Sequence, residues 1–406
     1  MFVDVVVVGG GPIGAVAARC AAEAGASVLL VDRRDNLDRS SCCTGLVSPR
    51  TLTTLGVSSH SVLREIRAIT VHAPDGQALE LSADQAKAIV IDRSLLEREL
   101  HGLARAAGVD VRMSTEAVSA SGNALVLRSA GGRKTVGTSI LVGADGPRSR
   151  VAEWSGLPPL EQSVGAAQAV IEPQQAVPPD RVEVFLGRDV APGFFAWAVP
   201  SDAEQLRVGL GVAPPLDPSE HLERLLTTRF PGCRTVSRTG GQIPVSPVPR
   251  AAVGSVLLVG DAAGQVKPLS GGGLYPGGIC ARIAGRIAAE TALSGKPNHR
   301  AAAAYESEWR STIGREIAFG RSVRRISERL SDSDLNALFA ACDDPNLLSF
   351  LAEHADIDRF HQLPDELAAH PSLWRKVLGL LPVIVGREIA DLPDRSPVVT
   401  APRAPL

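Results

Sequence analysis

Short apolar runs, separated by polar or glycine-containing turns, recur along this chain. Phe2–Val8 is rich in valine, the pattern of a strand buried on both faces. An alanine-rich helical stretch follows, and residues 27–31 form a second strand pattern that ends at Asp32. Residues 139–142 and 253–259 are further buried-strand patterns. Buried strands that alternate with helices predict an α/β fold built on a parallel sheet.

A second kind of pattern, alternating with a period of two, indicates a separate antiparallel sheet. Residues 66–81 alternate around a Pro-Asp-Gly turn at 74–76, which predicts a β-hairpin. Residues 164–213 are β-rich, with extended patterns at 165–171, 181–185, 194–199 and 206–212. This sheet is expected to form a substrate domain inserted into the α/β domain.

Helical patterns fill most of the remaining chain. Residues 93–107 carry an apolar stripe at helical spacing, so this helix is expected to pack on a sheet. A glycine-rich segment at 268–278 leads into a long helix that ends near Ser294. Residues 296–392 are predicted to form a C-terminal helical region, and the proline-rich residues 393–406 a loosely ordered tail.

Gly9, Gly11 and Gly14 follow the first strand directly, in G-x-G-x-x-G spacing. In a strand–helix–strand unit the first glycine makes the tight turn and the second lets the backbone approach a pyrophosphate. The third allows close helix–strand packing, and an acidic residue about 20 positions on binds a ribose hydroxyl. Asp32 stands at that position. The helix N-terminus adds N–H groups and partial positive charge, so the segment predicts a dinucleotide site.

Two further loops lie where buried strands end. Residues 143–146 (Gly-Ala-Asp-Gly) follow the strand at 139–142, and residues 260–263 (Gly-Asp-Ala-Ala) follow the strand at 253–259. Each alone is an ordinary turn sequence, because Gly and Asp are the usual turn residues. Ligands of open α/β sheets bind at the carboxyl ends of the strands, so the three loops together indicate one cofactor. The combination resembles the FAD-binding core of the para-hydroxybenzoate hydroxylase-like superfamily.

This resemblance implies FAD and gives roles to single residues. Asp261 is expected at the ribityl chain and the Asp145-Gly146 loop by the pyrophosphate. Arg93 matches the family's arginine near the flavin. The glycine run at 271–273 begins a helix whose N-terminus would stabilise negative charge on the N1/O2 edge of a reduced flavin. The residues expected to bind FAD are Gly9, Gly11, Pro12, Ile13, Gly14, Asp32, Arg33, Cys42, Gly45, Leu46, Arg93, Asp145, Gly146, Gly260, Asp261, Pro268, Gly271, Gly272, Gly273 and Leu274.

Three segments resemble motifs of the geranylgeranyl reductases. Residues 42–46 (Cys-Cys-Thr-Gly-Leu) are similar to their C-x-x-G-L loop, and residues 192–200 to their Y-x-W-x-F-P strand. Residues 260–274 are similar to their G-D-A-A-G…P…G-G-G-[IL] block. The motif tyrosine is Phe195 here and the motif phenylalanine is Val199, so the pocket is expected to accept a different prenyl substrate.

The resemblance implies a reductase that saturates double bonds of a geranylgeranyl-type lipid or diphosphate by hydride transfer from N5 of reduced flavin. The residues expected to act in catalysis are Cys42, Gly272 and Gly273. The Cys42 thiol could donate the proton, gate the site or be structural. The residues expected to line the apolar substrate tunnel are Phe194, Phe195, Trp197, Val199 and Tyr275.

Other chemistries of the same superfamily stay open at this point. An aromatic monooxygenase would use NAD(P)H and O₂, and a lycopene-cyclase-like enzyme would transfer no net electrons. A halogenase needs a lysine between flavin and substrate, for which Lys87 is the candidate. No second G-x-G-x-x-G unit is visible, so the electron donor is open between NAD(P)H and ferredoxin.

Composition and charge limit the classes of partner and the location that can be expected for this protein. The 406 residues carry a formal net charge of −2, which disfavours nucleic acid. No apolar run reaches the ~18 residues of a membrane span, and no signal peptide is visible, so a cytoplasmic protein is expected. An amphipathic stretch at 373–389 leaves contact with a membrane surface open. The six scattered cysteines indicate neither a disulfide framework nor a metal site.

The expected fold is α/β, or α+β overall: a Rossmann-type FAD-binding domain with an inserted antiparallel substrate sheet and a C-terminal helical region. The FAD-binding domain is expected to be discontinuous, over residues 1–65, 88–156 and 240–295. Residues 66–87 and 157–239 are assigned to the substrate-binding sheet.

Overall fold

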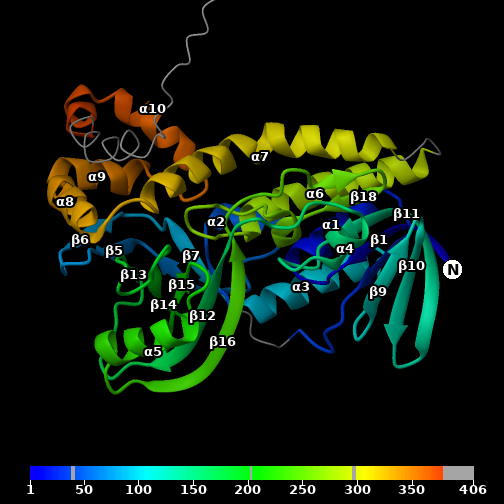
Figure 1. Cartoon of the computed structure of the whole chain (residues 1–406), viewed down its shortest axis with the longest axis horizontal. Helices are drawn as coiled ribbons and strands as arrows, with labels where there is room; N and C mark the ends of the chain where they lie inside the picture. Colours follow the sequence, from blue (N-terminus) through cyan, green and yellow to red (C-terminus); the bar gives the residue numbers. More distant parts are fainter. Residues whose placement is uncertain (38–41, 202–203, 295–298, 378–406) are drawn as a thin grey trace, which may run out of the picture.

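The structure is a computed structural model that describes residues 1–37, 42–201, 204–294 and 299–377. Two large sheets lie at opposite ends of its long axis, and long helices run along one side (Figure 1). The mixed α/β architecture with C-terminal helices confirms the predicted fold class.

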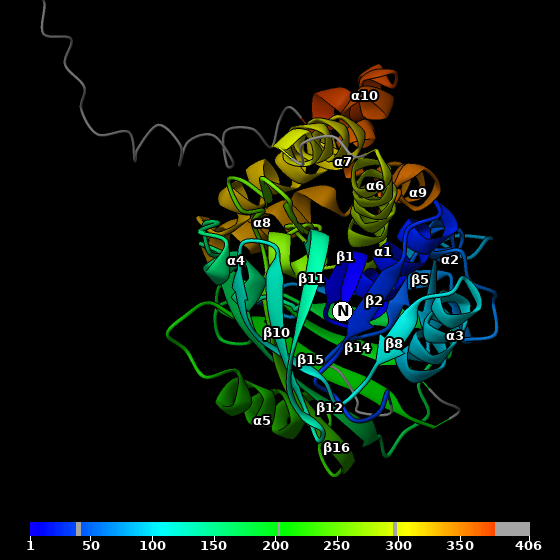
Figure 2. The same ribbon diagram turned by 90° about the vertical axis from the view of Figure 1, so that its right-hand side faces the viewer.

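The first sheet carries the predicted nucleotide fold. Its path runs β17-β18-β11-β1-β2-β8, and β1 pairs in parallel with both β11 and β2 (Figure 2). Strands β9 and β10 extend it as an antiparallel flap on β11. Every residue from Val5 to Val7 and from Leu29 to Leu30 is fully buried, which explains the continuous valine and leucine runs. The strands are β1 (Phe2–Val8), β2 (Val28–Val31), β8 (Asp110–Arg112), β9 (Glu116–Ser121), β10 (Ala124–Ser129), β11 (Gly132–Gly143), β17 (Ala252–Val253) and β18 (Val256–Leu258).

Small residues let the helices of this domain approach one another closely. α1 packs against α6 where a Cβ on Gly285 would lie 2.4 Å from the Ala17 carbonyl oxygen. α7 lies over α6 and extends to the C-terminal helices (Figure 1). The helices of this domain are α1 (Pro12–Glu23), α3 (Arg93–Ala106), α4 (Arg150–Trp154), α6 (Leu274–Leu293), α7 (His299–Ser327) and the 3₁₀ turn η1 (Gly260–Ala263).

The second sheet has seven strands in the order β16-β12-β15-β14-β13-β5-β6, antiparallel except for the β13–β5 pair. Helix α5 (Pro218–Arg229) covers one face through Leu222, Leu225 and Leu226. The strands are β5 (Ala68–His72), β6 (Ala78–Ser82), β12 (Ser163–Glu172), β13 (Arg181–Phe185), β14 (Ala196–Pro200), β15 (Leu206–Val212) and β16 (Arg234–Pro244).

A small third sheet and the C-terminal helices complete the described chain. The sheet joins the two domains through β3 (Leu46–Val47), β4 (Val62–Ile66) and β7 (Ala88–Ile91), with α2 (Pro49–Leu55) following β3. The C-terminal helices are α8 (Asp332–Cys342), α9 (Pro345–His354), the 3₁₀ turn η2 (Phe360–Gln362) and α10 (Leu363–Ala368).

Two sequence-based expectations need correction. The run at 253–259 is not one strand, because a turn with Gly254 at φ +54° splits it into the antiparallel pair β17 and β18. The long strand β16 was not predicted, and it pairs with β12 up to Pro244.

The expected membrane-surface segment at 373–389 is described only to residue 377, and the tail 393–406 lies outside the described residues. Within the described ranges, no helix is both long and apolar enough to cross a membrane.

Candidate active site

The glycine turn between β1 and α1 has the shape of a phosphate cradle. A Cβ on Gly14 would lie 1.9 Å from the Gly9 carbonyl oxygen, and Gly9 has a φ of +105°, so both positions require glycine. A Cβ on Gly11 would meet no atom within 4 Å. Gly11 is the N-cap of α1 and offers no side-chain acceptor, so the first N–H groups of the helix remain for an anion.

Asp32 closes the turn at the end of β2. Its carboxylate accepts the N–H of Gly10 at 2.6 Å and the N–H of Arg34 at 2.7 Å. The Arg34 guanidinium donates to the Gly10 carbonyl at 3.0 Å and to Glu97 at 2.9 Å. The structure therefore brings Arg34 to this site and leaves Arg33, the arginine expected from the sequence, exposed.

Glu97 bridges this end of the site to residues 42–46, which we call the Cys loop. It is 4% exposed and pairs with Arg93 through Oε1 at 2.8 Å, whereas Arg34 pairs with Oε2. Arg93 then donates to the Cys43 sulfur at 3.3 Å, and the Gly45 N–H donates to the same sulfur at 3.4 Å. Burial opposes the charge of Arg93, but the Cys43 sulfur and the Glu97 carboxylate raise its pKa above the ordinary value. Arg93 thus lies beside the loop at which the flavin is expected.

The two adjacent cysteines have different surroundings. Cys42 packs against β16, where a Cβ on Gly241 would lie 3.2 Å from the Cys42 Cβ. Burial, aided by the nearby Cys43, raises the pKa of the Cys42 thiol to about 11, while a hydrogen bond with Thr239 lowers it slightly. The Cys42 thiol therefore stays protonated at neutral pH, whereas the Cys43 sulfur lies against a cation.

Asp261 and the start of α6 form the third part of the site. A Cβ on Gly273 would lie 3.0 Å from Asp261 Oδ1. Among the described residues, no side chain or N–H is hydrogen-bonded to the Asp261 carboxylate. Burial raises the pKa of this carboxyl above its ordinary value, and the nearby Arg93 reduces the shift. Gly273 is the N-cap of α6 and has no side-chain cap, so this helix also begins with N–H groups available to an anion. Ile13 packs on Gly260 and joins this turn to α1.

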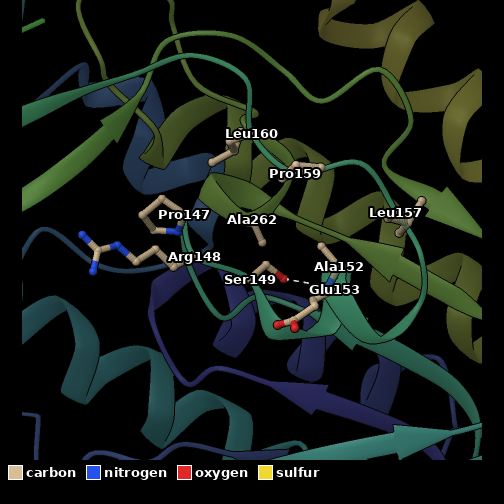
Figure 3. A pocket seen from close by; sticks show the side chains of 9 residues that line it. All are labelled: Pro147, Arg148, Ser149, Ala152, Glu153, Leu157, Pro159, Leu160 and Ala262. Atoms are coloured by element: carbon tan, nitrogen blue, oxygen red, sulfur yellow. Dashed lines mark hydrogen bonds between the residues drawn. The ribbon is translucent and has the colours of Figure 1, made fainter. Parts of the chain in front are cut away.

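The Asp145 loop lies beside the glycine turn, where a Cβ on Gly9 would be 2.2 Å from the Ala144 carbonyl oxygen. The Asp145 carboxylate accepts from Ser149 Oγ at 2.6 Å and from the N–H of Arg150 at 2.8 Å, so it organises the start of α4. Burial raises the pKa of Asp145 and these hydrogen bonds lower it. Gly146 has open space beside it, and a cavity of about 480 Å³ lies between the residues after it and Ala262 (Figure 3).

The aromatic residues expected at the substrate gather on one side of β14. Phe194 and Phe195 stack at 4.3 Å, and Phe195 meets Trp197 edge-on at 5.9 Å. They pack with Val199 in one apolar group, which we call the aromatic cluster. Tyr275 does not belong to it, because its ring is buried in the core of the FAD-binding domain.

Hydrogen bonds tie the aromatic cluster to the Cys loop. Trp197 Nε1 donates to Gln168 Oε1 at 3.2 Å, and Gln168 Nε2 donates to the Cys43 carbonyl at 3.2 Å. Arg207 donates to the Thr44 carbonyl at 2.7 Å. Gln168 and Arg207 were not among the predicted site residues, although a polar residue inside each of two apolar strands was a usable signal.

Comparison with known proteins identifies the family. Residues 2–222 match the FAD binding domain family. A digeranylgeranylglycerophospholipid reductase of Methanothrix thermoacetophila is 34% identical over 356 residues, which is 83% of this chain and 90% of the relative. This chain belongs to the geranylgeranyl reductase family.

Solved structures agree on the fold. A geranylgeranyl bacteriochlorophyll reductase-like protein from Thermoplasma acidophilum superposes with a TM-score of 0.80 at 22% identity, over 93% of this chain and 99% of that one. The p-nitrophenol 4-monooxygenase of Pseudomonas putida DLL-E4 gives 0.68 at 16% identity, over 86% and 97% of the two chains. The fold is therefore shared by proteins that are named for different reactions.

The protein is an FAD-dependent oxidoreductase, and the residues described above fit that cofactor. The α1 N-terminus and the space beside Gly11 would hold the pyrophosphate, and Asp32 the adenosine ribose. The unpartnered carboxylate of Asp261 would accept from a ribityl hydroxyl. The α6 N-terminus would then lie near the isoalloxazine ring.

Proposed function

We propose that this protein reduces isolated carbon–carbon double bonds of a polyprenyl lipid or diphosphate of geranylgeranyl type. The observation that carries the proposal is the path from Trp197 through Gln168 to Cys43, which fixes an apolar wall beside the Cys loop. The name of the archaeal relative, a reductase of a geranylgeranyl lipid, supports the same substrate class.

Isolated alkenes offer no polar group for the enzyme to activate. Placement against the cofactor and exclusion of water must therefore carry much of the catalysis. Trp197 is 5% exposed and Val199 1% exposed, so the aromatic cluster is shielded from water. The α7 residue Arg324 lies 5.2 Å above the Phe194 ring and covers the cluster from the C-terminal side.

The proposed reaction adds a hydride and a proton across the double bond. When bound, reduced FAD supplies the hydride from N5. Cys42 keeps its proton on Sγ at neutral pH, because its pKa is about 11, and can deliver that proton to the second carbon. The N–H groups that follow Gly272 and Gly273 at the start of α6 stabilise negative charge at the cofactor. An external donor, NAD(P)H or a ferredoxin, supplies the two electrons.

Monooxygenase and halogenase chemistry would make different demands on the pocket. A halogenase would need the Lys87 ammonium between flavin and substrate, but this group donates instead to the Glu353 carbonyl. A monooxygenase shares the fold, so reactivity must separate it from a reductase.

The test is an anaerobic reoxidation assay. Photoreduced protein is mixed with geranylgeranyl diphosphate or a geranylgeranylated glycerol lipid, and flavin absorbance is followed. We expect reoxidation without O₂, and a slower rate in Cys42→Ala, because one proton donor is lost. A flavin that stays reduced with every prenyl compound until O₂ enters would overturn the proposal in favour of a monooxygenase.

A further inference from the structure

A short segment of the C-terminal region closes on the aromatic cluster. Residues 355–359, which we call the strap, connect α9 to the turn η2. Ile357 packs against the same apolar group as Trp197 and Val199, together with Leu46 of the Cys loop. The strap thus contributes an aliphatic wall from a part of the chain about 160 residues away from β14.

A buried carboxylate anchors the strap. Asp358 is 1% exposed and pairs with the Lys267 ammonium at 3.0 Å. It also accepts from the Ser48 hydroxyl, and Arg50 lies 3.8 Å away. The same Lys267 ammonium donates to the Ile357 carbonyl at 3.0 Å, so one side chain holds both residues. A buried ion pair is weak evidence for stability but defines one arrangement of its surroundings.

Lys267 belongs to the loop that leads from Asp261 to the glycine run. Its N–H donates to the Gly272 carbonyl at 3.1 Å, and its carbonyl accepts from Gly271 at 2.8 Å. A Cβ on Gly272 would lie 2.7 Å from Lys267 Cε, so the lysine stem packs directly on the run. The position of the strap is therefore fixed by the same loop that is expected to face the flavin.

We propose that Ile357 determines which prenyl chains the pocket accepts, and that Lys267 and Asp358 are positioning residues that hold it there. This inference rests on the proposed function and adds a residue of the strap to the apolar group that contains Val199. Val199 is smaller than the phenylalanine of the family motif, so an aliphatic residue from the strap can share the space that the motif residue would fill. An apolar pocket discriminates by fit, at about ten- to two-hundredfold per methylene.

Hydrogen–deuterium exchange tests the anchoring without any turnover. The N–H of Asp358 donates to the Asp356 carboxylate at 2.8 Å, and that of Arg359 to the Asp356 carbonyl, so the strap has amides to follow. We expect Lys267→Met and Asp358→Asn to speed their exchange by at least about tenfold. Arg315→Met is the control, because its ion pair with Asp365 is 3.9 Å long and both side chains are largely exposed. Unchanged exchange in both strap variants would overturn the anchoring.

Chain-length preference tests the role of Ile357. Affinities of the FAD-loaded protein for ten-carbon and twenty-carbon prenyl diphosphates are compared, together with their kcat/KM in the anaerobic assay. We expect Ile357→Ala to raise, and Ile357→Phe to lower, the twenty- over ten-carbon ratio by about tenfold each. A ratio that stays within about twofold in both variants would overturn the role of Ile357.

The two tests also separate this inference from the proposed function. If prenyl compounds bind and react but neither variant shifts the ratio, only the inference fails. If no prenyl compound binds or reoxidises the flavin, the proposed function fails and the specificity role of Ile357 fails with it. The exchange result then still decides whether Lys267 and Asp358 hold the strap.

Discussion

Replacing Gly11 with alanine is expected to change the cofactor site without changing the fold of the chain. Gly11 has φ −65° and ψ 176°, a conformation that alanine adopts without strain. A methyl group there would meet no protein atom within 4 Å. The new methyl group therefore enters only the space that the pyrophosphate is expected to occupy.

The substitution is expected to affect the stability of the apoprotein and the affinity for FAD to different extents. We expect the free energy of unfolding of the apoprotein to change by less than about 1 kcal/mol, since no contact is broken and the unfolded chain loses little freedom. In the loaded protein the phosphate must withdraw from the N–H groups at the start of α1. Hydrogen bonds to a charged group are worth about 1.5–3 kcal/mol each, so two of them correspond to at least about a hundredfold in Kd.

The assay is a titration of apoprotein with FAD, followed by flavin fluorescence, beside thermal unfolding of the apoprotein. Gly102→Ala is the matched control, because Gly102 lies exposed in α3 and a Cβ there also meets no atom within 4 Å. It should keep the FAD affinity and raise stability by up to about 1 kcal/mol. An unchanged Kd in Gly11→Ala would refute the placement of the pyrophosphate beside this residue.

Three further outcomes are expected. Glu97→Gln leaves two half-buried arginines, Arg34 and Arg93, without their shared carboxylate, so urea unfolding should show a loss of about 2 kcal/mol; a loss below about 0.5 kcal/mol would contradict the bridge. Folding raises the pKa of the Cys42 thiol. The contribution of the buried, protonated thiol to the free energy of unfolding is therefore fully present below pH 9 and is lost as the pH rises through about 11. Unfolding of Cys42→Ala should therefore depend less on pH between 9 and 11 than that of the wild type, and equal slopes would exclude the burial effect. Trp197→Phe removes the hydrogen bond with Gln168 and should raise KM for a prenyl substrate about tenfold with FAD affinity unchanged, whereas an equal loss of FAD affinity would contradict a substrate role.

The sequence was most informative where one local stretch sets the geometry. The roles of Gly9, Gly11 and Gly14 follow from backbone conformation and spacing, and the structure shows a close approach or open space at each. The hairpin around residues 74–76 was likewise predictable, because turn residues act over a few positions.

Choices between neighbouring residues could not be made from sequence alone. Arg34 rather than Arg33 reaches the site because of how the chain leaves β2 and meets Glu97, 63 residues further on. In the same way Cys43, not Cys42, meets Arg93, from a helix 50 residues away. Such contacts depend on the packing of two elements, which no local pattern encodes.

Elements with weak local patterns were also missed. β16 has mostly half-exposed or exposed positions and contains Gly240 and Gly241, so it lacks the apolar alternation of the other strands. Asp358 lies in an acidic stretch typical of a solvated loop, and its partner Lys267 is 91 residues away. Its burial follows only from the packing of the C-terminal region against the loop that contains Lys267.

The proposed double-bond reduction is tested by measuring product mass together with the reducing equivalents consumed. Protein carrying one equivalent of reduced FAD is incubated with geranylgeranyl diphosphate in the absence of O₂, and flavin absorbance and product mass are recorded on the same sample. We expect one reduced double bond, a gain of two mass units, for each flavin reoxidised. Product of unchanged mass, or product that gains oxygen only after O₂ is admitted, would contradict it.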